Sequence, residues 1–400
     1  MLGDEERGTE RALVRESLRY EDLPEGGEQR SRPEVTQGAK RRVHDADGPF
    51  RAERARMKTE AMVLLGHGGP EALVRQAIEL GEPGPREVRI RVRAVALNHL
   101  DLWVRRGGPA FKLEFPHRLG SDIAGEVEAV GPGARGVTVG ERVLVHPGVS
   151  CGVCGACKSG SDNLCRSYRI LGENTQGGYA EHVVVGDDAV LPIGAQPWAE
   201  AAALPLCTVT AWQMAYRKGA VAPGMTVLVN AAGSGVSTML IQLCKLAGAR
   251  VIATTTSAGK VEHARALGAD EVLLTSEEEL TAGVRRLTGK LGVDVAFDHL
   301  GGEPFEKTLA ALRWGGRVVT CGATAGFHPN FDLRTVFFKQ LEIRGSTMGT
   351  KGDLVSAMAL VQAGRLRPVV DRVMPLWDAA EAHRVLERRE AFGKVVLEVP

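Results

Sequence analysis

The chain has 400 residues, of which 44% are hydrophobic and 25% are charged. This length exceeds what one hydrophobic core usually organises, so we expect at least two folded units. The composition excludes wholesale disorder, a collagen-like repeat and a disulfide-dense scaffold. Fifty basic and 49 acidic residues leave a formal net charge of +1, so no overall field would attract nucleic acid or an anionic membrane.

Residues 1–57 are rich in arginine and glutamate and poor in large apolar side chains. Because such a segment cannot offset its ordering entropy by burial, the sequence predicts a disordered or loosely helical tail, with a regulatory or partner-binding arm as the alternative. The segment lacks the apolar core of a secretory signal, and no stretch of the chain reaches the roughly 20 apolar residues of a membrane-spanning helix. We expect a cytoplasmic protein with reduced thiols and without membrane or nucleic-acid partners.

Short segments with the pattern of β-strands follow the tail. In residues 88–95, apolar and charged side chains alternate with period two, which is typical of a half-exposed strand. Residues 125–131 and 141–145 continue this pattern, and glycine and proline at 131–133 interrupt it. The sequence therefore predicts an all-β module here.

Four cysteines with short spacing come next, at Cys151, Cys154, Cys157 and Cys165. Four thiolates complete the tetrahedral shell of zinc and leave no position for water or substrate, so we predict a structural zinc site. Buried core cysteines and an iron–sulfur cluster are the alternatives. The other three cysteines stand in apolar runs and are expected to be inert core residues: Cys207, Cys244 and Cys321.

After about residue 204 the pattern changes to alternating strands and helices. The apolar runs read as buried on both faces, which predicts a doubly wound parallel sheet and an α/β fold. The last 50 residues contain a helix and a short strand that could rejoin the β module. The expected strands of the sheet are residues 226–229, 250–253, 271–274, 293–297, 317–320 and 341–344.

The first of these strands runs into a glycine-containing turn that opens a helix. Such a turn presents backbone N–H groups and the positive end of a helix to a pyrophosphate. Ser237 stands where the third glycine of the usual fingerprint would be, and a plain strand–helix connection is the alternative. The candidate coenzyme-binding residues are Gly233, Ser234, Gly235 and Val236.

The second strand ends without the Asp or Glu that would bind the ribose diol of NAD. Thr254, Ser257 and Lys260 offer hydroxyls and a positive charge that suit a 2′-phosphate instead. We therefore expect NADP as the coenzyme, with NAD as the alternative. A solvated lysine at a helix start is the other interpretation of Lys260.

Together these motifs resemble the medium-chain dehydrogenase/reductase superfamily, which includes the zinc-type alcohol dehydrogenases and the quinone oxidoreductases. The resemblance covers residues 58–400. It implies a GroES-like β-barrel catalytic domain, built from residues 58–203 and completed by 351–400, and a Rossmann domain of residues 204–350. It also implies a homodimer or homotetramer, in which the last Rossmann strand pairs across the interface.

The active-site turns differ from those of the alcohol dehydrogenase branch, which holds a catalytic zinc on cysteine and histidine. The matching positions here carry Asn98, Ser121 and Leu206, which cannot hold zinc tightly as a set. We therefore expect no catalytic zinc. Cys207 could be recruited by a one-residue slip of this alignment, and Asp122 could join Asp101 and His99 in a different site.

The turn at Asn98 resembles the quinone oxidoreductase branch more closely. This implies an NADPH-dependent reductase that transfers hydride to a quinone or an α,β-unsaturated carbonyl without metal, where Asn98 contacts the substrate. His99 would deliver the proton or face the coenzyme pyrophosphate, and Trp103 replaces a tyrosine that some members carry. The alternatives are a zinc-type alcohol dehydrogenase and a non-catalytic coenzyme-binding protein with a structural or interaction role.

Overall fold

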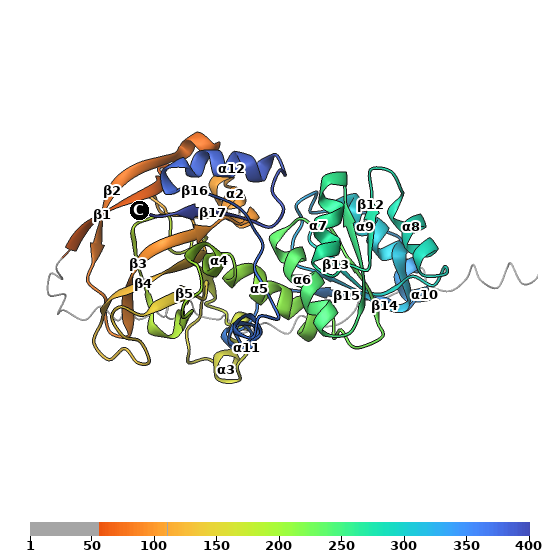
Figure 1. Cartoon of the computed structure of the whole chain (residues 1–400), viewed down its shortest axis with the longest axis horizontal. Coiled ribbons are helices and arrows are strands. Elements are labelled where there is room, and N and C mark those ends of the chain that lie inside the picture. Colours follow the sequence, from red (N-terminus) through yellow and green to blue (C-terminus); the bar gives the residue numbers. More distant parts are fainter. Residues whose placement is uncertain (1–55, 110) are drawn as a thin grey trace, which may run out of the picture. The chain divides into compact units, whose positions relative to one another are not determined.

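The computed structural model describes residues 56–109 and 111–400 (Figure 1). The predicted tail lies outside these residues except for Arg56 and Met57, which begin strand β1 (Arg56–Leu64). This strand pairs with β2 (Leu73–Gly81) in an antiparallel hairpin. No helix in the described part of the chain has the length and apolarity of a transmembrane span.

A seven-stranded sheet with the order β16-β17-β3-β4-β5-β9, in which β8 also pairs with β3, forms the GroES-like part. The predicted alternation in residues 88–95 is confirmed, because Val88, Ile90 and Val92 of β3 are fully buried. The last strand returns to this sheet and pairs antiparallel with β3. The strands are β3 (Glu87–Ala96), β4 (Asp122–Val130), β5 (Arg142–Val145), β8 (His182–Gly186), β9 (Val190–Pro192), β16 (Val370–Pro375) and β17 (Lys394–Glu398).

A six-stranded parallel sheet with the order β12-β11-β10-β13-β14-β15 forms the Rossmann part. The predicted α/β fold with a GroES-like module and a doubly wound sheet is confirmed. The strands are β10 (Thr226–Val229), β11 (Arg250–Thr255), β12 (Glu271–Leu274), β13 (Val293–Asp298), β14 (Leu312–Thr320) and β15 (Glu342–Gly345).

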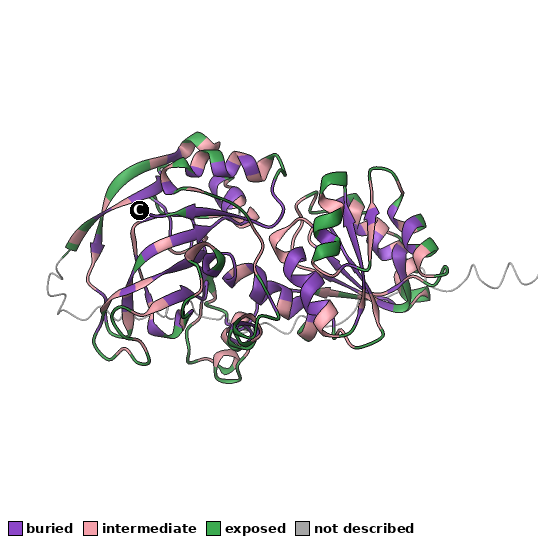
Figure 2. Ribbon diagram, in the orientation of Figure 1, coloured by how far each residue is buried: buried purple, intermediate pink, exposed green. Residues whose placement is uncertain are grey.

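Helices cover both faces of the parallel sheet, which is why its strands are apolar on both sides. In β10, Val227 and Val229 belong to the core that helix α6 completes, whereas Leu228 belongs to the core of α8 and α9. Figure 2 shows these strands as mostly buried. The helices are α6 (Gly235–Leu246), α7 (Val261–Ala266), α8 (Leu280–Leu287), α9 (Gly302–Ala311) and α10 (Leu333–Phe338).

The remaining elements connect and cover the two sheets. Helix α5 (Pro205–Trp212) continues into a π-helical segment, η4 (Gln213–Lys218), and packs against α6 and α11. The other helices are α2 (His99–Arg106), α3 (Gly155–Lys158), α4 (Trp198–Ala202), α11 (Lys351–Gln362) and α12 (Ala379–Glu387), and two short strands are β6 (Gly148–Val149) and β7 (Arg169–Ile170). Single 3-10 turns are η1 (Pro70–Ala72), η2 (Asp162–Leu164), η3 (Asp187–Ala189), η5 (Ala258–Lys260) and η6 (Leu376–Asp378).

The order of the parallel strands places a switch point at β10. The chain leaves β10 for β11 on one side, and β13 lies on its other side. Ligands of doubly wound sheets bind outside the carboxyl ends of the strands at such a point. The turn after β10 is therefore where the fold itself favours a coenzyme.

Candidate active site

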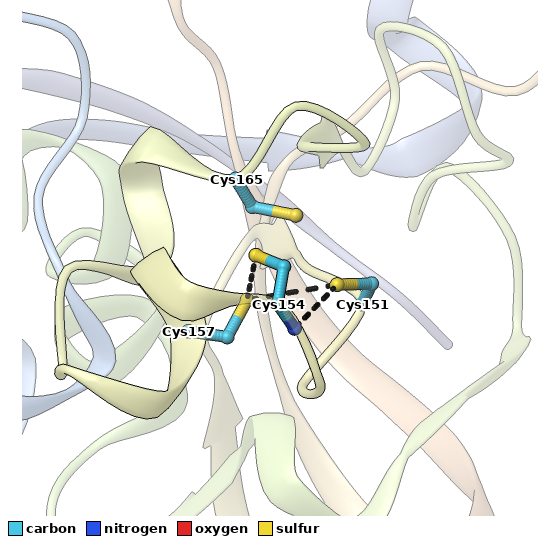
Figure 3. A group of neighbouring side chains, drawn as sticks. All are labelled: Cys151, Cys154, Cys157 and Cys165. Carbon is cyan, nitrogen blue, oxygen red and sulfur yellow. Dashed lines mark hydrogen bonds between the residues drawn. The ribbon is translucent and has the colours of Figure 1, made fainter.

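The four predicted metal-binding cysteines meet in one lobe (Figure 3). Their sulfur atoms all lie within 4.8 Å of one another, and the Sγ of Cys157 is 3.6 Å from that of Cys154 and 3.9 Å from that of Cys151. A Zn–S bond of about 2.3 Å implies sulfur–sulfur distances of about 3.8 Å in a tetrahedron. The lobe therefore fits zinc, and the predicted four-cysteine structural site is confirmed.

The predicted coenzyme turn forms the beginning of α6. The N–H of Ser237 donates to the Oγ of Ser234, which caps the helix. His299, at the end of β13, lies with its Nε2 3.0 Å from Ser234 Oγ and 3.1 Å from Ser237 Oγ. A Cβ at Gly235 would lie 2.6 Å from the Sγ of Cys207, so this position requires glycine. The two hydroxyls and His299 thus form one hydrogen-bonded group at the start of α6.

Thr254 and Ser257 have local roles at the end of β11. The Oγ1 of Thr254 accepts a hydrogen bond from the N–H of Ala231 and lies 3.3 Å from Asn230 Oδ1, so this side chain supports the coenzyme turn from beneath. The N–H of Ser257 donates to Thr255 Oγ1.

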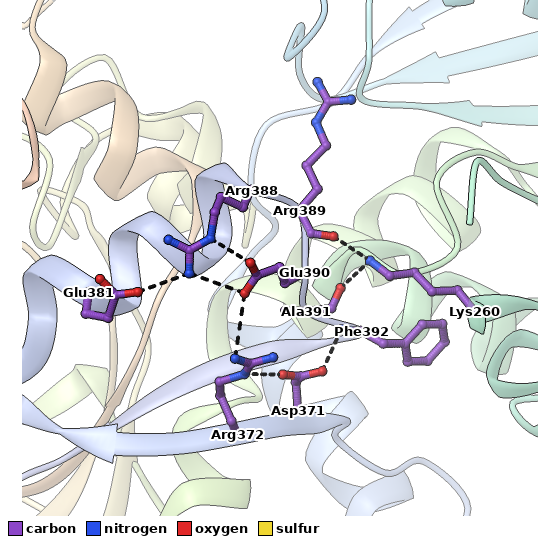
Figure 4. A network of polar contacts seen from close by, with 9 residues as sticks. All are labelled: Lys260, Asp371, Arg372, Glu381, Arg388, Arg389, Glu390, Ala391 and Phe392. Carbon is purple, nitrogen blue, oxygen red and sulfur yellow. Dashed lines mark hydrogen bonds and ion pairs between the residues drawn. The ribbon is translucent and has the colours of Figure 1, made fainter. Parts of the chain in front are cut away.

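The ammonium of Lys260 is held by main-chain carbonyl groups. Its Nζ donates to the carbonyl oxygens of Arg389 at 2.8 Å and Ala391 at 2.7 Å (Figure 4). Burial lowers the pKa of Lys260. The lysine therefore binds the segment between α12 and β17, and two of its three N–H groups are used there.

A buried polar cluster joins side chains from four separate segments next to the coenzyme turn. The Nζ of Lys394 donates to Asn98 Oδ1 at 2.6 Å and to Asp122 Oδ2 at 2.8 Å, and it lies 3.5 Å from Cys207 Sγ. The Nδ2 of Asn98 donates to Asp122 Oδ2 at 2.9 Å. The side chain of Lys394 is 3% exposed and that of Asp122 is 0% exposed. The cluster thus brings together the predicted residues Asn98 and Asp122 and two residues that were not predicted to act.

Lys394 is the residue that the sequence reasoning missed. It was assigned to a short strand, and the signal that could have marked it is a lysine at the start of an otherwise apolar run. The alignment that placed Leu206 in the site is also corrected. The main-chain N–H of Leu206 donates to Asp122 Oδ1 at 2.6 Å, whereas the thiol of Cys207 is what reaches Asn98, at 3.7 Å.

The charges of this cluster follow from burial and from the ion pair. Burial opposes the charge of Lys394, but the charge and hydrogen bond of Asp122 together with the other nearby acidic groups outweigh it and raise the pKa of the lysine, so Lys394 is an ammonium. Burial raises the pKa of Cys207 to about 11, so it is a neutral thiol. The cluster therefore contains one buried cation and one buried anion in direct contact.

His99 begins helix α2 at the edge of this cluster. Burial, with the nearby charges of His299 and Lys394, lowers the pKa of His99 to about 4. The imidazole is therefore neutral at physiological pH. It can accept a proton, but it does not carry one to give away.

The remaining active-site turn residues are structural. The carboxylate of Asp101 accepts from the N–H groups of Asn98 at 2.7 Å and Gly120 at 2.9 Å, and burial raises its pKa to about 6. The Oγ of Ser121 donates to the carbonyl of Leu171. Neither side chain takes part in the cluster of Lys394.

A cavity of about 360 Å³ lies at the carboxyl ends of β14 and β15. Among the described residues, Gln213 Oε1 and Ser346 Oγ line it as buried polar atoms without a hydrogen-bond partner. Cys321 also lines it, and burial raises the pKa of the Cys321 thiol. The other lining residues are Asn163, Leu164, Lys218, Thr320, Gly322, Gly345 and Thr347.

Comparisons with known proteins agree with this architecture. Models of the "Alcohol dehydrogenase GroES-like domain" and of "Zinc-binding dehydrogenase" match residues 84–195 and 235–363. An NAD-dependent alcohol dehydrogenase of Saccharolobus solfataricus is 34% identical over 335 residues, which are 80% of this chain and 95% of that protein.

Solved structures give the same picture. The structure of an NAD-dependent alcohol dehydrogenase has 48% identity and a TM-score of 0.82, and the match covers 85% of this chain and all of that one. A thermostable alcohol dehydrogenase from Pyrobaculum aerophilum, with cobalt and zinc bound, has 35% identity and a TM-score of 0.78, with 86% of this chain and all of that one covered.

These matches contradict the function expected from the sequence. The NADPH-dependent reductase of quinones or α,β-unsaturated carbonyls is wrong, because the relatives above are NAD-dependent and other alcohol dehydrogenases. The alternative of an alcohol dehydrogenase is the better one. The expected branch was inferred from the turn at Asn98, and the relatives above overturn that inference.

The donor set near Asn98 does not fit the catalytic zinc of that branch. An ammonium, Lys394 Nζ, lies 2.6–3.5 Å from the atoms of Asn98, Asp122 and Cys207 that would have to hold the ion. In residues 56–109 and 111–400, the four cysteines of the lobe are the one group of three or more His, Cys, Asp or Glu ligand atoms that converge. The cluster is already neutralised by a cation of the protein itself.

Proposed function

We propose that this chain, an NAD(P)-dependent oxidoreductase that belongs to the zinc-binding dehydrogenases of the medium-chain dehydrogenase/reductase superfamily, is an NAD-dependent alcohol dehydrogenase with a structural zinc lobe. The observation that carries the proposal is the contact between the coenzyme turn and the polar cluster. A Cβ at Gly235 would meet both Cys207 Sγ, at 2.6 Å, and Lys394 Cδ, at 2.8 Å. A coenzyme held at the start of α6 would thus lie beside the polar cluster.

The chemistry needs two partners at this junction. When bound, NAD⁺ would supply the acceptor for the hydride of the alcohol carbon, and the hydroxyl proton would be released as the C=O bond forms. The chain's residues bind and orient. Gly233, Ser234, Gly235 and Val236 would bind the pyrophosphate through their N–H groups and the positive end of α6.

Neutral His99 is the candidate acceptor of the released proton. At physiological pH its imidazole is neutral and has a free lone pair, and its pKa of about 4 makes it a weak base that would pass the proton on to solvent. In alcohol oxidation, we therefore propose His99 as a proton acceptor, whereas the sequence had suggested a proton donor for the reduction. The substrate would occupy the cavity at the ends of β14 and β15, where the unpaired Gln213 and Ser346 atoms suit a polar group.

The contacts of Lys260 support NAD rather than NADP. Two of its N–H groups are bound to main-chain carbonyls, so a 2′-phosphate would have to compete with them for the ammonium. The hydroxyls near the end of β11 are neutral and can bind the ribose of NAD. We propose NAD as the preferred coenzyme for this reason.

Two further proposals concern the whole protein. We propose that residues 58–203 with 351–400 and residues 204–350 act as catalytic and coenzyme domains of a cytoplasmic enzyme. We also propose a homodimer that pairs along the edge strand β15. Large apolar side chains are exposed at this edge: Trp314 by 66%, Phe337 by 59%, Phe338 by 63% and Ile343 by 43%.

The proposal is tested by turnover of the purified full chain. A panel of primary and secondary alcohols with NAD⁺, and of the matching aldehydes and ketones with NADH, should be followed by the absorbance of reduced nicotinamide. We expect oxidation of at least one alcohol and reduction of its carbonyl product. Turnover confined to quinones or α,β-unsaturated carbonyls would contradict the proposal.

A further inference from the structure

We propose that the ammonium of Lys394 occupies the place of a catalytic metal ion and stabilises the substrate oxygen during hydride transfer. The inference rests on the proposed function and deepens it, because it names the group that polarises the C–O bond. Relatives in this family include a metal-bound alcohol dehydrogenase, whereas in this chain the polar atoms of the candidate site converge on a lysine.

The ammonium of Lys394 is bound through all of its N–H groups, as a cation is bound in a dedicated site. Its three N–H groups have three acceptors, Asn98 Oδ1 at 2.6 Å, Asp122 Oδ2 at 2.8 Å and Cys207 Sγ at 3.5 Å. These acceptors come from the start of α2, from β4 and from α5, so three elements fix the position of the ammonium. A flexible surface lysine would have none of these restraints.

One of the three contacts is exchangeable. Sulfur is a weak acceptor, and the contact to Cys207 is the longest of the set. The carbonyl or alkoxide oxygen of a substrate is a stronger acceptor and would replace the thiol at this N–H group. The Sγ of Cys207 lies at the coenzyme turn, where a Cβ on Gly235 would be 2.6 Å from it, so an oxygen that replaced the thiol would lie beside the bound coenzyme.

Oxidation of an alcohol at this site needs no reactant besides the alcohol and NAD⁺. In oxidation, the O–H bond breaks and its proton passes to His99 or to solvent, while hydride leaves the carbon for NAD⁺. The developing negative charge on oxygen lies against the Lys394 ammonium, which keeps its three protons throughout. Asp122 holds the lysine in its charged form, so Lys394 acts by charge and hydrogen bonding and not by proton transfer.

Metal analysis of the untreated full-length enzyme is the first test, and its result does not depend on turnover. We expect close to one zinc per chain, and Cys154→Ser should remove it. A second zinc that stays after dialysis, and that persists in Cys154→Ser, would overturn the inference because the lysine and the ion cannot share one position.

Kinetics of Lys394 variants form the second test. Because Lys394→Met alone leaves the buried Asp122 without its cation, the variant to test is the neutral pair Lys394→Met with Asp122→Asn. We expect kcat of that pair to fall by about 10²–10³-fold, the usual effect of removing one donor to a developing oxyanion. The dissociation constant for NADH, measured by fluorescence, should stay near that of the unmodified enzyme.

Two controls separate a catalytic role from a structural one. Lys245→Met removes a lysine of α6 that forms a partly exposed ion pair with Asp270, and it should keep full activity. Lys394→Ala should regain turnover when methylammonium is added, because a small amine can enter the space of the lost ammonium. If the neutral pair keeps the kcat of the unmodified enzyme, Lys394 does not stabilise the substrate oxygen. If no alcohol is oxidised by the unmodified enzyme, the proposed function fails, and the metal count still decides the occupant of the cluster.

Discussion

Replacement of Asp122 by asparagine should destabilise the protein strongly, although the two side chains have the same shape. Three donors converge on this carboxylate: Leu206 N on Oδ1, and Asn98 Nδ2 and Lys394 Nζ on Oδ2. An asparagine offers one oxygen. In one orientation its NH₂ group faces the N–H of Leu206, and in the other it faces both the amide of Asn98 and the ammonium of Lys394. Every orientation leaves a donor facing a donor, and the buried ammonium loses its anion.

The size of the effect can be bounded. Removing one partner of a buried ion pair typically costs about 3–5 kcal/mol. Deprotonating the lysine limits the loss: at 1.36 kcal/mol per pKa unit, taking a lysine from its ordinary pKa of 10.5 to neutrality at pH 7 costs about 5 kcal/mol. We therefore expect Asp122→Asn to lower the free energy of unfolding by about 3–5 kcal/mol. For a chain of 400 residues, with an unfolding entropy of about 2.1 cal/mol/K per residue, that corresponds to a fall in Tm of roughly 4–6 °C.

The assay is urea and thermal unfolding of the full chain, with the double variant Lys394→Met, Asp122→Asn completing a mutant cycle. The double variant should recover much of the loss, because it buries no unpaired charge. The pKa of Lys394 is raised in the fold, so the contribution of its charge is complete below the ordinary lysine pKa and is lost only as pH rises through the folded value. The difference in stability between the unmodified protein and Asp122→Asn should therefore be largest at about pH 6–7 and shrink as the pH rises, because at pH 9 deprotonation of the unpaired lysine would cost only about 2 kcal/mol.

The matched control is Glu262→Gln, which breaks a surface pair with Arg265 whose side chains are 77% and 53% exposed. It should cost less than about 1 kcal/mol. An Asp122→Asn protein as stable as this control would refute the reasoning that Lys394 is a buried cation that depends on Asp122.

Four other predictions follow from the same structure. Cys154→Ser should lose the zinc and lower the Tm while the folded protein still transfers hydride, whereas the core variant Cys244→Ser should keep its zinc; metal analysis beside the melting curve checks both. The ratio of kcat/KM for NAD⁺ to that for NADP⁺ should be about ten or more, equivalent to ~1.4 kcal/mol, and a preference for NADP⁺ would show that Lys260 leaves its carbonyls. Phe337→Glu should shift the mass measured by light scattering from dimer to monomer, and an unchanged mass would exclude the β15 edge as the interface. Burial lowers the pKa of His383 to about 3, so below pH 6.5 the unfolded chain binds a proton that the folded chain does not. The contribution of His383 to stability should therefore be complete above about pH 6.5 and fall by up to ~1.4 kcal/mol per pH unit below it. His383→Gln should reduce that slope in urea unfolding measured at several pH values.

Local sequence patterns predicted the parts of the molecule that local interactions build. The four zinc-binding cysteines fall within fifteen residues of the sequence, so their spacing alone indicated the site. The alternation in β3 and the apolar runs of the parallel strands indicated the two sheets, because each pattern reports which faces of a strand are covered. The glycine turn before α6 was predictable for the same reason.

The function could not be derived in this way, because the features used to choose a branch depended on distant partners. Lys260 was read with its neighbours in the sequence, but its ammonium binds carbonyls 129 and 131 positions away. The role of Asn98 likewise depends on the side chains around it, which are distant in the sequence.

The sequence by itself determined the fold class, the zinc lobe and the position of the coenzyme turn, since each depends on periodicity or spacing within a short segment. Only the tertiary structure decided what stands at the centre of the active site. Lys394 is 296 positions from Asn98 and 272 from Asp122, and the pairing of β17 with β3 is what brings the C-terminal lysine to them. A buried charge needs partners on all sides, and in this chain those partners come from elements that meet only when both sheets have formed.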